Sequence, residues 1–446
     1  MTEPTLPLEE GQGELFQDAV PQEALPGEEE AKAASAKNYK ALRGETKYLK
    51  VLAATLIGRF GDSIDSIAYT WLVYALSGSA SLSAVTYGVN TLISVLLQPF
   101  TGALITNARI KRALVLTDLG RGLLVCLTAL LYWAGLARPW MLIALTACMS
   151  TLEAFRQPAN MALLPKLLSK EKYTVGMSLS GGLSRMAELV GLGLAGFLIA
   201  ALGISGALLM DAAAFLASGL LLSTLKLRLP PGGEAGQSPW RQFLQDTREG
   251  FGYVAKDRVV LAICASACLL NFALVPMNAL QTAYVNEGLR LGPEALSVMG
   301  IALSVGLALG SLTFPKAAAK RSRFALLFAG ALGTTAAYLG LGAVSFVPVL
   351  WLKWGLLVLV KLSMGVAASF ANTSVSVSFM EKTEEKYLAR ASGILGASCM
   401  AALPLGSFLM AGLAQFISVT ALVFGFGIFA VAVALGFLLI KPLREI

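Results

Sequence analysis

The chain lacks histidine altogether and contains few charged residues. Without an imidazole group, any proton transfer near neutral pH has to use carboxylates. Charged residues make up 14% of the sequence and hydrophobic residues 56%, whereas soluble domains carry roughly 25% charged residues. Such a chain cannot cover its surface with polar groups in water, which excludes an ordinary soluble domain.

Patterns for catalysis and metal binding are also missing. The five cysteines follow no metal-site spacing and all fall in apolar runs, so we interpret them as small packing residues. No nucleophile–base pair and no phosphate-binding glycine loop stands in an aqueous segment. The sequence therefore predicts that the protein is not an enzyme, uses no cofactor or metal, and does not hydrolyse ATP by itself.

Long apolar runs fill the chain after residue 47. A helix that rises ~1.5 Å per residue needs ~20 apolar residues to cross a hydrocarbon core about 30 Å thick. Twelve such runs predict an all-α membrane protein with twelve transmembrane helices, at residues 48–76, 82–105, 113–134, 139–164, 173–201, 204–225, 259–284, 295–314, 324–344, 350–374, 391–416 and 419–440. The 44 glycines suit close helix packing in lipid.

Similar landmarks recur in the two halves of the chain. Glu171-Lys172-Tyr173 precedes the fifth run, and Glu385-Lys386-Tyr387 precedes the eleventh. Two pseudo-symmetric six-helix bundles form one large class of transporters, which bind substrate between the bundles. The predicted division is a disordered acidic tail at 1–38, an N-terminal bundle at 39–226, a connector with an amphipathic helix at 227–258, and a C-terminal bundle at 259–446.

Basic residues are distributed unevenly over the loops. If the N-terminus is cytoplasmic, the outer loops carry only Arg138, Arg290 and Lys353, as the positive-inside rule requires. This predicts a multi-pass protein of a bacterial plasma membrane with both termini in the cytoplasm. The net charge of +8 is then a topology signal and not a nucleic-acid footprint. The acidic tail is interpreted as a solvated spacer, with gating or partner binding as the alternative.

The first run carries Arg59, Asp62 and Asp65 at three-residue intervals, along one helix face. A charge at the bilayer centre costs at least ~2.5–3.5 kcal/mol, so such residues face protein or water. Because two carboxylates compete for one arginine, one of them is expected to take up a proton. Asp62 or Asp65 is therefore the predicted proton-coupling residue.

The fourth and fifth runs repeat the pairing of an arginine with a carboxylate one turn away, in Glu153–Arg156 and Arg185–Glu188. Glu188 is a further candidate for proton coupling. Glu153, Arg156 and Arg185 are interpreted, with Arg59, as charge partners of the coupling carboxylates. The alternative is that both pairs are structural and hold the N-terminal bundle together.

The second half of the chain is nearly free of charge inside its runs, with Lys361 as the clear exception. This contrast predicts that carboxylates of the first bundle bind and release protons and that the second bundle supplies a mainly apolar wall of the cavity. Helix–helix hydrogen bonds are the alternative explanation for neutral amides inside the membrane. The predicted substrate cavity is lined by Gln157, Asn160, Asn271, Asn278, Lys361 and Asn372.

Several short motifs, taken in order, are similar to those of one family. They are Gly61-Asp62 and residues 68–74, 77–79, 118–122, 155–160, 164–165 and 404–406. Along twelve runs they resemble the major facilitator superfamily, over essentially the whole chain from about residue 48. Within it the chain resembles the drug:proton antiporter branch that includes macrolide-efflux-like permeases.

The resemblance implies a gating network around the loop between the second and third helices. Its members here would be Gly102, Arg109, Lys111, Arg112, Asp118 and Arg121. The family's loop usually carries an aspartate that this chain lacks, since Thr106-Asn107 follow Gly102; Asp118 and Arg121 are expected to keep part of the network. The branch also favours a Gly-Pro pair in the fifth helix, where residues 191–196 have leucine in place of proline.

The residues and the resemblance together predict a secondary active transporter that exports a small amphipathic or drug-like molecule. Two bundles would rock about a central site, and inward proton flow would drive the substrate out. The expected partners are the substrate, protons and the lipid bilayer, and the expected state is a monomer. The alternatives are an exporter or facilitator of a specific metabolite, siderophore or lipid, and a membrane sensor that transports nothing.

Overall fold

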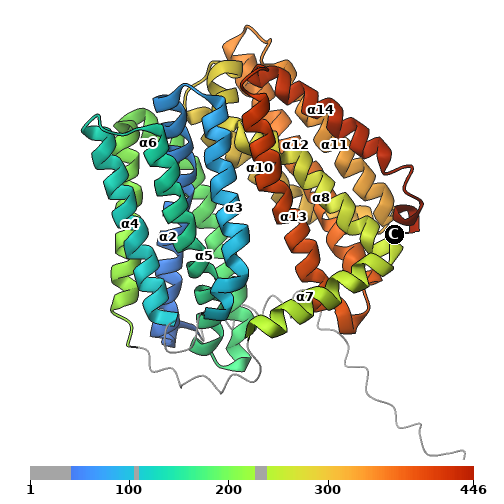
Figure 1. Cartoon of the computed structure of the whole chain (residues 1–446), viewed down its shortest axis with the longest axis horizontal. Coiled ribbons are helices and arrows are strands. Elements are labelled where there is room, and N and C mark those ends of the chain that lie inside the picture. Colours follow the sequence, from blue (N-terminus) through green and yellow to red (C-terminus); the bar gives the residue numbers. More distant parts are fainter. Residues whose placement is uncertain (1–41, 105–109, 227–238, 446) are drawn as a thin grey trace, which may run out of the picture.

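The computed structural model describes residues 42–104, 110–226 and 239–445 (Figure 1), so the acidic tail and Arg109 lie outside the described residues. The described chain forms helices and turns and contains no strand. The first half holds η1 (Leu42–Gly44), α2 (Thr46–Ser77), α3 (Ala80–Leu104), α4 (Ile110–Trp133), α5 (Pro139–Leu167) and α6 (Lys170–Ser223). The second half holds α7 (Pro239–Lys256), α8 (Arg258–Ala279), α9 (Gln281–Ala283), η2 (Tyr284–Leu289), α10 (Glu294–Ala318), α11 (Arg323–Val344), α12 (Leu350–Lys382), α13 (Glu385–Leu413), α14 (Val419–Gly436) and η3 (Lys441–Glu445).

Local sequence sets several helix ends. Gly78 ends α2 with a φ of 58°, a left-handed conformation that glycine adopts at little cost. Gly203, with a φ of 71°, breaks α6 into two spans, which correspond to the predicted fifth and sixth runs. Asp257 caps α8, because its side chain accepts hydrogen bonds from the backbone N–H groups of Val259 (2.8 Å) and Val260 (3.1 Å).

Nine helices of the described residues are long and apolar enough to cross a membrane. This number counts α6 once, although Gly203 divides it. It omits α2 and α5, whose charged and polar residues lower their mean hydropathy. With both parts of α6, and with α2 and α5, the described chain accounts for the twelve predicted spans.

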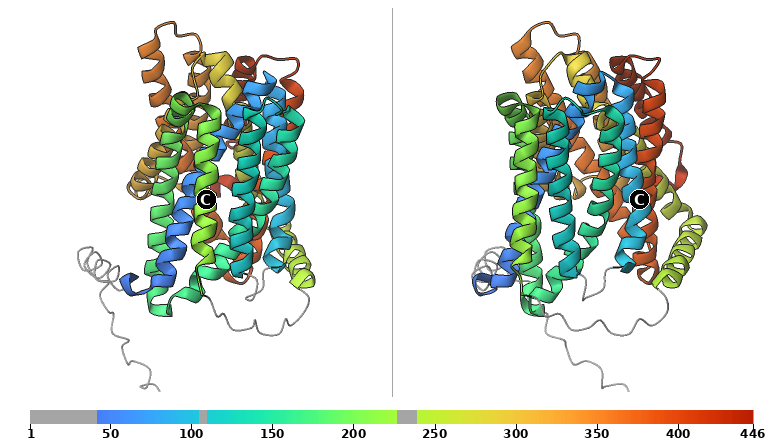
Figure 2. Two further views of the ribbon diagram at one scale, coloured as in Figure 1. Left: turned by 90° about the vertical axis from the view of Figure 1, so that its left-hand side faces the viewer. Right: turned by 60° about the vertical axis from the view of Figure 1, so that its left-hand side comes forward.

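The helices form two groups that lie side by side. Figure 1 shows α2–α6 in one group, α8–α14 in the other, and α7 running across one end between them. The side views of Figure 2 show that the spanning helices run in broadly the same direction. The predicted all-α membrane fold of two bundles is therefore confirmed. We name the end of the bundles opposite α7 the far end.

The bundles contact each other mainly through two helix pairs, α3 with α13 and α6 with α10. In two equivalent halves, α3 corresponds to α10 and the first part of α6 corresponds to α13. The two pairs are therefore equivalent to each other, as duplicated bundles require. Three hydrogen bonds of the described residues join the bundles, and all three lie toward the far end. They run from Tyr74 Oη to Glu287 Oε1 (2.7 Å), from Ser81 Oγ to the Ala411 carbonyl (2.6 Å) and from the Gly196 amide to Ser297 Oγ (2.7 Å).

Helix α7 is fixed to the C-terminal bundle. Glu249 forms an ion pair with Arg390 of α13 at 2.5 Å. The Tyr253 ring stacks on Tyr387 with 4.5 Å between centroids, and its hydroxyl accepts a hydrogen bond from the Glu384 amide (3.0 Å). The helix therefore occupies the second half of the predicted connector and is anchored to the start of α13.

Candidate functional site

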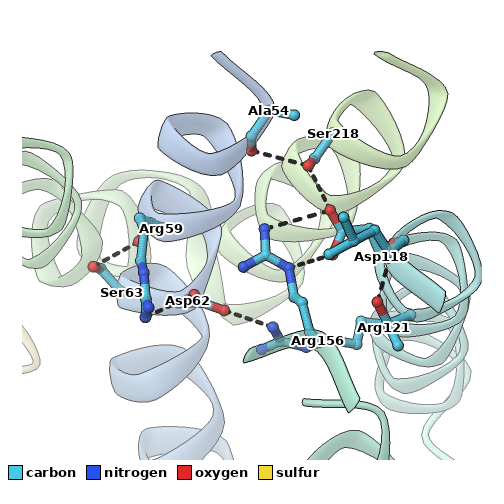
Figure 3. A network of polar contacts seen from close by, with 10 residues as sticks. Ala54, Arg59, Asp62, Ser63, Asp118, Arg121, Arg156 and Ser218 are labelled. Carbon is cyan, nitrogen blue, oxygen red and sulfur yellow. Dashed lines mark hydrogen bonds and ion pairs between the residues drawn. The ribbon is translucent and has the colours of Figure 1, made fainter. Parts of the chain in front are cut away.

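Asp62 lies at the centre of a network of charges inside the N-terminal bundle (Figure 3). Its Oδ1 atom is 2.7 Å from Arg121 Nη1 on α4, and its Oδ2 atom is 3.6 Å from Arg59 Nη1 on α2. The three-residue spacing predicts the second contact but not the first. Because Arg121 is 3% exposed and Arg59 is 39% exposed, the interhelical pair is the less solvated of the two.

Arg156 forms the second buried ion pair, with Asp118 rather than with Glu153 as the sequence suggests. Arg156 Nε lies 2.5 Å from Asp118 Oδ1, and Ser218 Oγ lies 2.5 Å from Asp118 Oδ2. Asp118 is fully buried. Removing either partner would leave an uncompensated buried charge, which makes this pair a strong constraint on the packing of α4 against α5 and α6.

Arg121 also contacts an aromatic ring. Its guanidinium carbon lies 4.1 Å from the centroid of the Phe215 ring on the second part of α6, a cation–π geometry. The network thus joins residues of α2, α4, α5 and α6. The ionisable side chains hold these four helices in one arrangement.

The residues predicted for the gating network fall in two places. Asp118 and Arg121 lie well inside α4, about 12 Å or more along the helix from its first residue, and bind Arg156 and Asp62. At the start of α4, Lys111 Nζ donates instead to the Ser223 carbonyl (2.8 Å), and Arg112 is exposed. Gly102 lies in the last turn of α3.

A cavity of about 410 Å³ lies between the two bundles. The N-terminal bundle contributes charged groups to its lining, and the C-terminal bundle contributes neutral ones. The charged lining residues are Asp62, Asp65, Arg121 and Glu153, and the facing residues include Asn278, Gln281, Thr282 and Leu296. We name this space the central cavity.

A second cavity of about 470 Å³ is lined by the N-terminal bundle alone. Gln157, Asn160 and Glu188 face it. Glu188 pairs with Arg185 at 2.9 Å, and the Arg185 side chain is 80% exposed. Three residues, Asp62, Arg121 and Glu153, line both cavities, so the charge network lies at their junction.

The other predicted cavity residues lie elsewhere in the C-terminal bundle. Asn271 donates to the Ala267 carbonyl of its own helix (2.9 Å). Asn372 lines a void of about 20 Å³ between α8, α11, α12 and α14. Lys361 is 2% exposed within α12. None of the three lines the central cavity or the second cavity.

Asp211 is a buried carboxylate of the site that the sequence analysis missed. It is fully buried in the second part of α6, beside Gly61 of α2, where a Cβ atom would lie 3.0 Å from Asp211 Oδ1. Neither oxygen finds a hydrogen-bond donor among the described residues. The available signal was a lone acidic residue in the apolar run 204–225, which is a functional candidate inside a membrane. Among the described residues, no group of three metal-ligating side chains is present.

Comparison with known proteins places the chain in a family. A family model described as Major Facilitator Superfamily matches residues 51–383. The multidrug efflux pump Tap of Mycolicibacterium fortuitum is 26% identical over 383 residues, which cover 82% of this chain and 89% of the pump. The uncharacterised transporter YvqJ of Bacillus subtilis (strain 168) is 26% identical over 274 residues, which cover 60% of this chain and 64% of YvqJ, slightly less than two thirds of that relative.

Solved structures share the fold at low identity. The nucleoside transporter NupG has a TM-score of 0.70 at 14% identity, over 88% of this chain and 98% of NupG. A bacterial homologue of the iron transporter ferroportin, in an inward-facing state, has a TM-score of 0.65 at 15% identity, over 88% and 98% of the two chains. The family model and the relatives found by sequence confirm the prediction of a membrane transporter rather than an enzyme. The chain belongs to the Major Facilitator Superfamily.

Proposed function

We propose that the protein is a secondary active transporter of a bacterial plasma membrane that exports a small amphipathic molecule in exchange for protons. The observation that carries this proposal is the central cavity, where carboxylates of one bundle face neutral side chains of the other. A site between two pseudo-symmetric bundles is where this architecture binds its cargo. A volume of about 410 Å³ lies in the range of pockets for drug-sized molecules.

The arrangement of contacts supports alternating access. Hydrogen bonds close the bundles together at the far end, and the second cavity extends from the charge network toward the beginning of α2, past Thr55 and Arg59. With the predicted orientation, the α7 end is cytoplasmic. In this state the cargo would enter from the cytoplasm, and breaking the far-end contacts would release it outside.

The proton step uses carboxylates of the charge network. Asp62 is held by Arg121 and Arg59, whereas Asp65 lines the central cavity and has no ion pair among the described residues. Protonation of Asp65 removes negative charge from the cavity, and this disfavours a bound cation. Glu188, beside the largely exposed Arg185, would change the field of the central cavity less, because solvent screens it.

The cargo that fits this lining is amphipathic and positively charged. Ile67, Met149, Leu192 and Leu296 supply apolar contacts around the carboxylates. The similarity to Tap, a multidrug efflux pump, supports a drug-like molecule.

Reconstitution into liposomes tests the proposal. An acidic lumen should drive ethidium, a permanent cation, into vesicles that contain the wild-type protein, because protons leave as the dye enters. Asp65→Asn should lower this response to the level of empty vesicles and weaken the binding of ethidium, because the neutral amide resembles protonated Asp65. Dye movement that ignores the pH gradient in the wild type would favour facilitated diffusion and contradict proton coupling.

A further inference from the structure

The charges in the core of the N-terminal bundle do not balance. Arg121 is paired with Asp62, and Arg156 is paired with Asp118. Asp65 and Asp211 are two additional carboxylates without a cation of their own among the described residues. A buried carboxylate is unfavourable unless it is paired or neutralised, so this surplus requires a neutralising ligand.

The two surplus carboxylates lie near each other. Asp211 Oδ1 would lie 3.0 Å from a Cβ atom on Gly61, and Asp65 follows Gly61 one turn later on the same face of α2. Asp65 Oδ1 and both Asp211 oxygens find no donor among the described residues. Ionised carboxylates only accept hydrogen bonds, whereas a protonated carboxyl group also donates one. One proton between Asp65 and Asp211 therefore supplies the missing donor and removes one of the two charges.

The surroundings fit a proton better than a metal ion. Three other charged groups line the central cavity with Asp65. They are Asp62, one turn earlier on α2, Arg121 on α4 and Glu153 on α5. Asp211 packs against Gly61 of α2, and the described residues contain no group of three metal-ligating side chains. A cation such as Na⁺ needs several oxygen ligands, and a proton needs only two.

Asp65 connects the buried pair to the solvent. It lines the central cavity, whereas Asp211 does not and is fully buried. A proton can thus pass from cavity water to Asp65, whose hydroxyl then donates to the Asp211 carboxylate. Release reverses these two steps, and the charge of the pair changes between −1 and −2 without any other reactant.

We propose that Asp65 and Asp211 share one proton and form the site that loads and unloads the transported proton, while Asp62 stays in its ion pair with Arg121. The proposal rests on the proposed function and names the residues that carry its proton. A deprotonated pair adds negative charge beside the central cavity. A cationic cargo would then stabilise that state, which is the exchange that antiport requires.

Infrared difference spectroscopy of the purified full-length chain tests the site without any cargo. At neutral pH the wild type should show a carboxylic acid band that shifts in D₂O and disappears on alkaline titration. Asp211→Asn and Asp65→Asn should each remove this band. The control Asp257→Asn should retain it, because Asp257 caps α8 outside the charge network and asparagine also serves as an N-cap. If one variant fails to fold, the other still decides the question.

Four results would overturn the proposal. Three are a wild type without the band, a band that survives in both variants, and a band that Glu153→Gln removes while the two aspartate variants keep it. A fourth is loss of the wild-type band when choline is replaced by Na⁺ at constant pH, because the pair would then bind sodium. Ethidium transport driven by a pH gradient is measured on the same preparations. The expected band without driven transport would refute the proposed function and leave the proton site intact.

Discussion

The N-terminal and C-terminal bundles have the same helix plan but differ in what holds their helices together. Ion pairs join α4 to α2 and α5 in the first bundle. In the second, α10 and α12 approach so closely that a Cβ atom on Gly306 would lie 2.2 Å from the Leu362 carbonyl oxygen. Lys361 is the one buried charged side chain in the described part of the second bundle.

This difference separates the requirements of the fold from those of the site. The second bundle forms six spans with almost no buried charge, so a six-helix bundle of this kind does not need the buried charged side chains that the first bundle has. Buried charges are costly in a membrane. Their concentration on one side of the central cavity therefore favours a role in transport.

Asp118→Asn should cause the largest loss of stability, because the first bundle depends on its buried ion pairs. Arg156 would remain buried without a carboxylate opposite, and breaking a buried ion pair costs about 3–5 kcal/mol. Ser369→Ala, which removes a 3.0 Å contact with Ser311 in the second bundle, should cost about 0.6 kcal/mol. Unfolding of the purified proteins in mixed detergent micelles measures both values. Similar losses would show that the two bundles depend on polar contacts equally.

Gly196→Ala should open the far end. The new methyl group would lie 2.4 Å from the Pro293 carbonyl oxygen, and such overpacking costs about 1–3 kcal/mol in the state that contains the contact. Gly412→Ala is the control, because nothing lies within 4 Å of its added Cβ atom. An impermeant thiol reagent, applied from the far end to Asn278→Cys in a protein without native cysteines, should label only the first variant faster. Equal labelling would mean that this contact does not hold the far end closed.

Tyr74→Phe should have a smaller effect in the same direction. It removes the 2.7 Å hydrogen bond to Glu287, worth about 0.5–1.5 kcal/mol, and changes no other far-end contact. The population open at the far end should rise by up to about tenfold, since about 1.4 kcal/mol corresponds to that factor. The labelling assay described for Gly196→Ala measures this change. Unchanged labelling would show that the bond forms without favouring either state.

Glu188→Gln should have the smallest effect of the series. Its partner Arg185 is 80% exposed, and exposed ion pairs contribute at most about 1 kcal/mol. Dye transport should keep its dependence on the pH gradient, and unfolding should change little. If dye transport by this variant no longer depended on the pH gradient, the proton site would have to be assigned to Glu188 in the second cavity instead of to the central cavity.

Much of the fold follows from the sequence, because apolar run length depends on local composition. The runs locate the spans, and the Gly203 break separates two of them. Gly196 packs between the bundles against Pro293, whereas Gly412 of α13 has open space beside it. Periodicity identifies small residues but does not reveal which helix they face.

The charge network was only partly predictable for the same reason. Spacing along α2 predicts the contact of Arg59 with Asp62. The pairs Asp62–Arg121 and Asp118–Arg156 join different helices, and their register depends on how the bundle packs. Asp211 has no charged neighbour in its own run, so no spacing rule could assign it a partner.

The most direct test of the central claim is proton movement driven by cargo. Ethidium is added outside weakly buffered proteoliposomes that have no imposed pH gradient. We predict that the external medium acidifies as ethidium enters wild-type vesicles, and that Asp65→Asn abolishes this acidification. Dye entry without acidification in the wild type, or the same acidification in Asp65→Asn, would contradict the account.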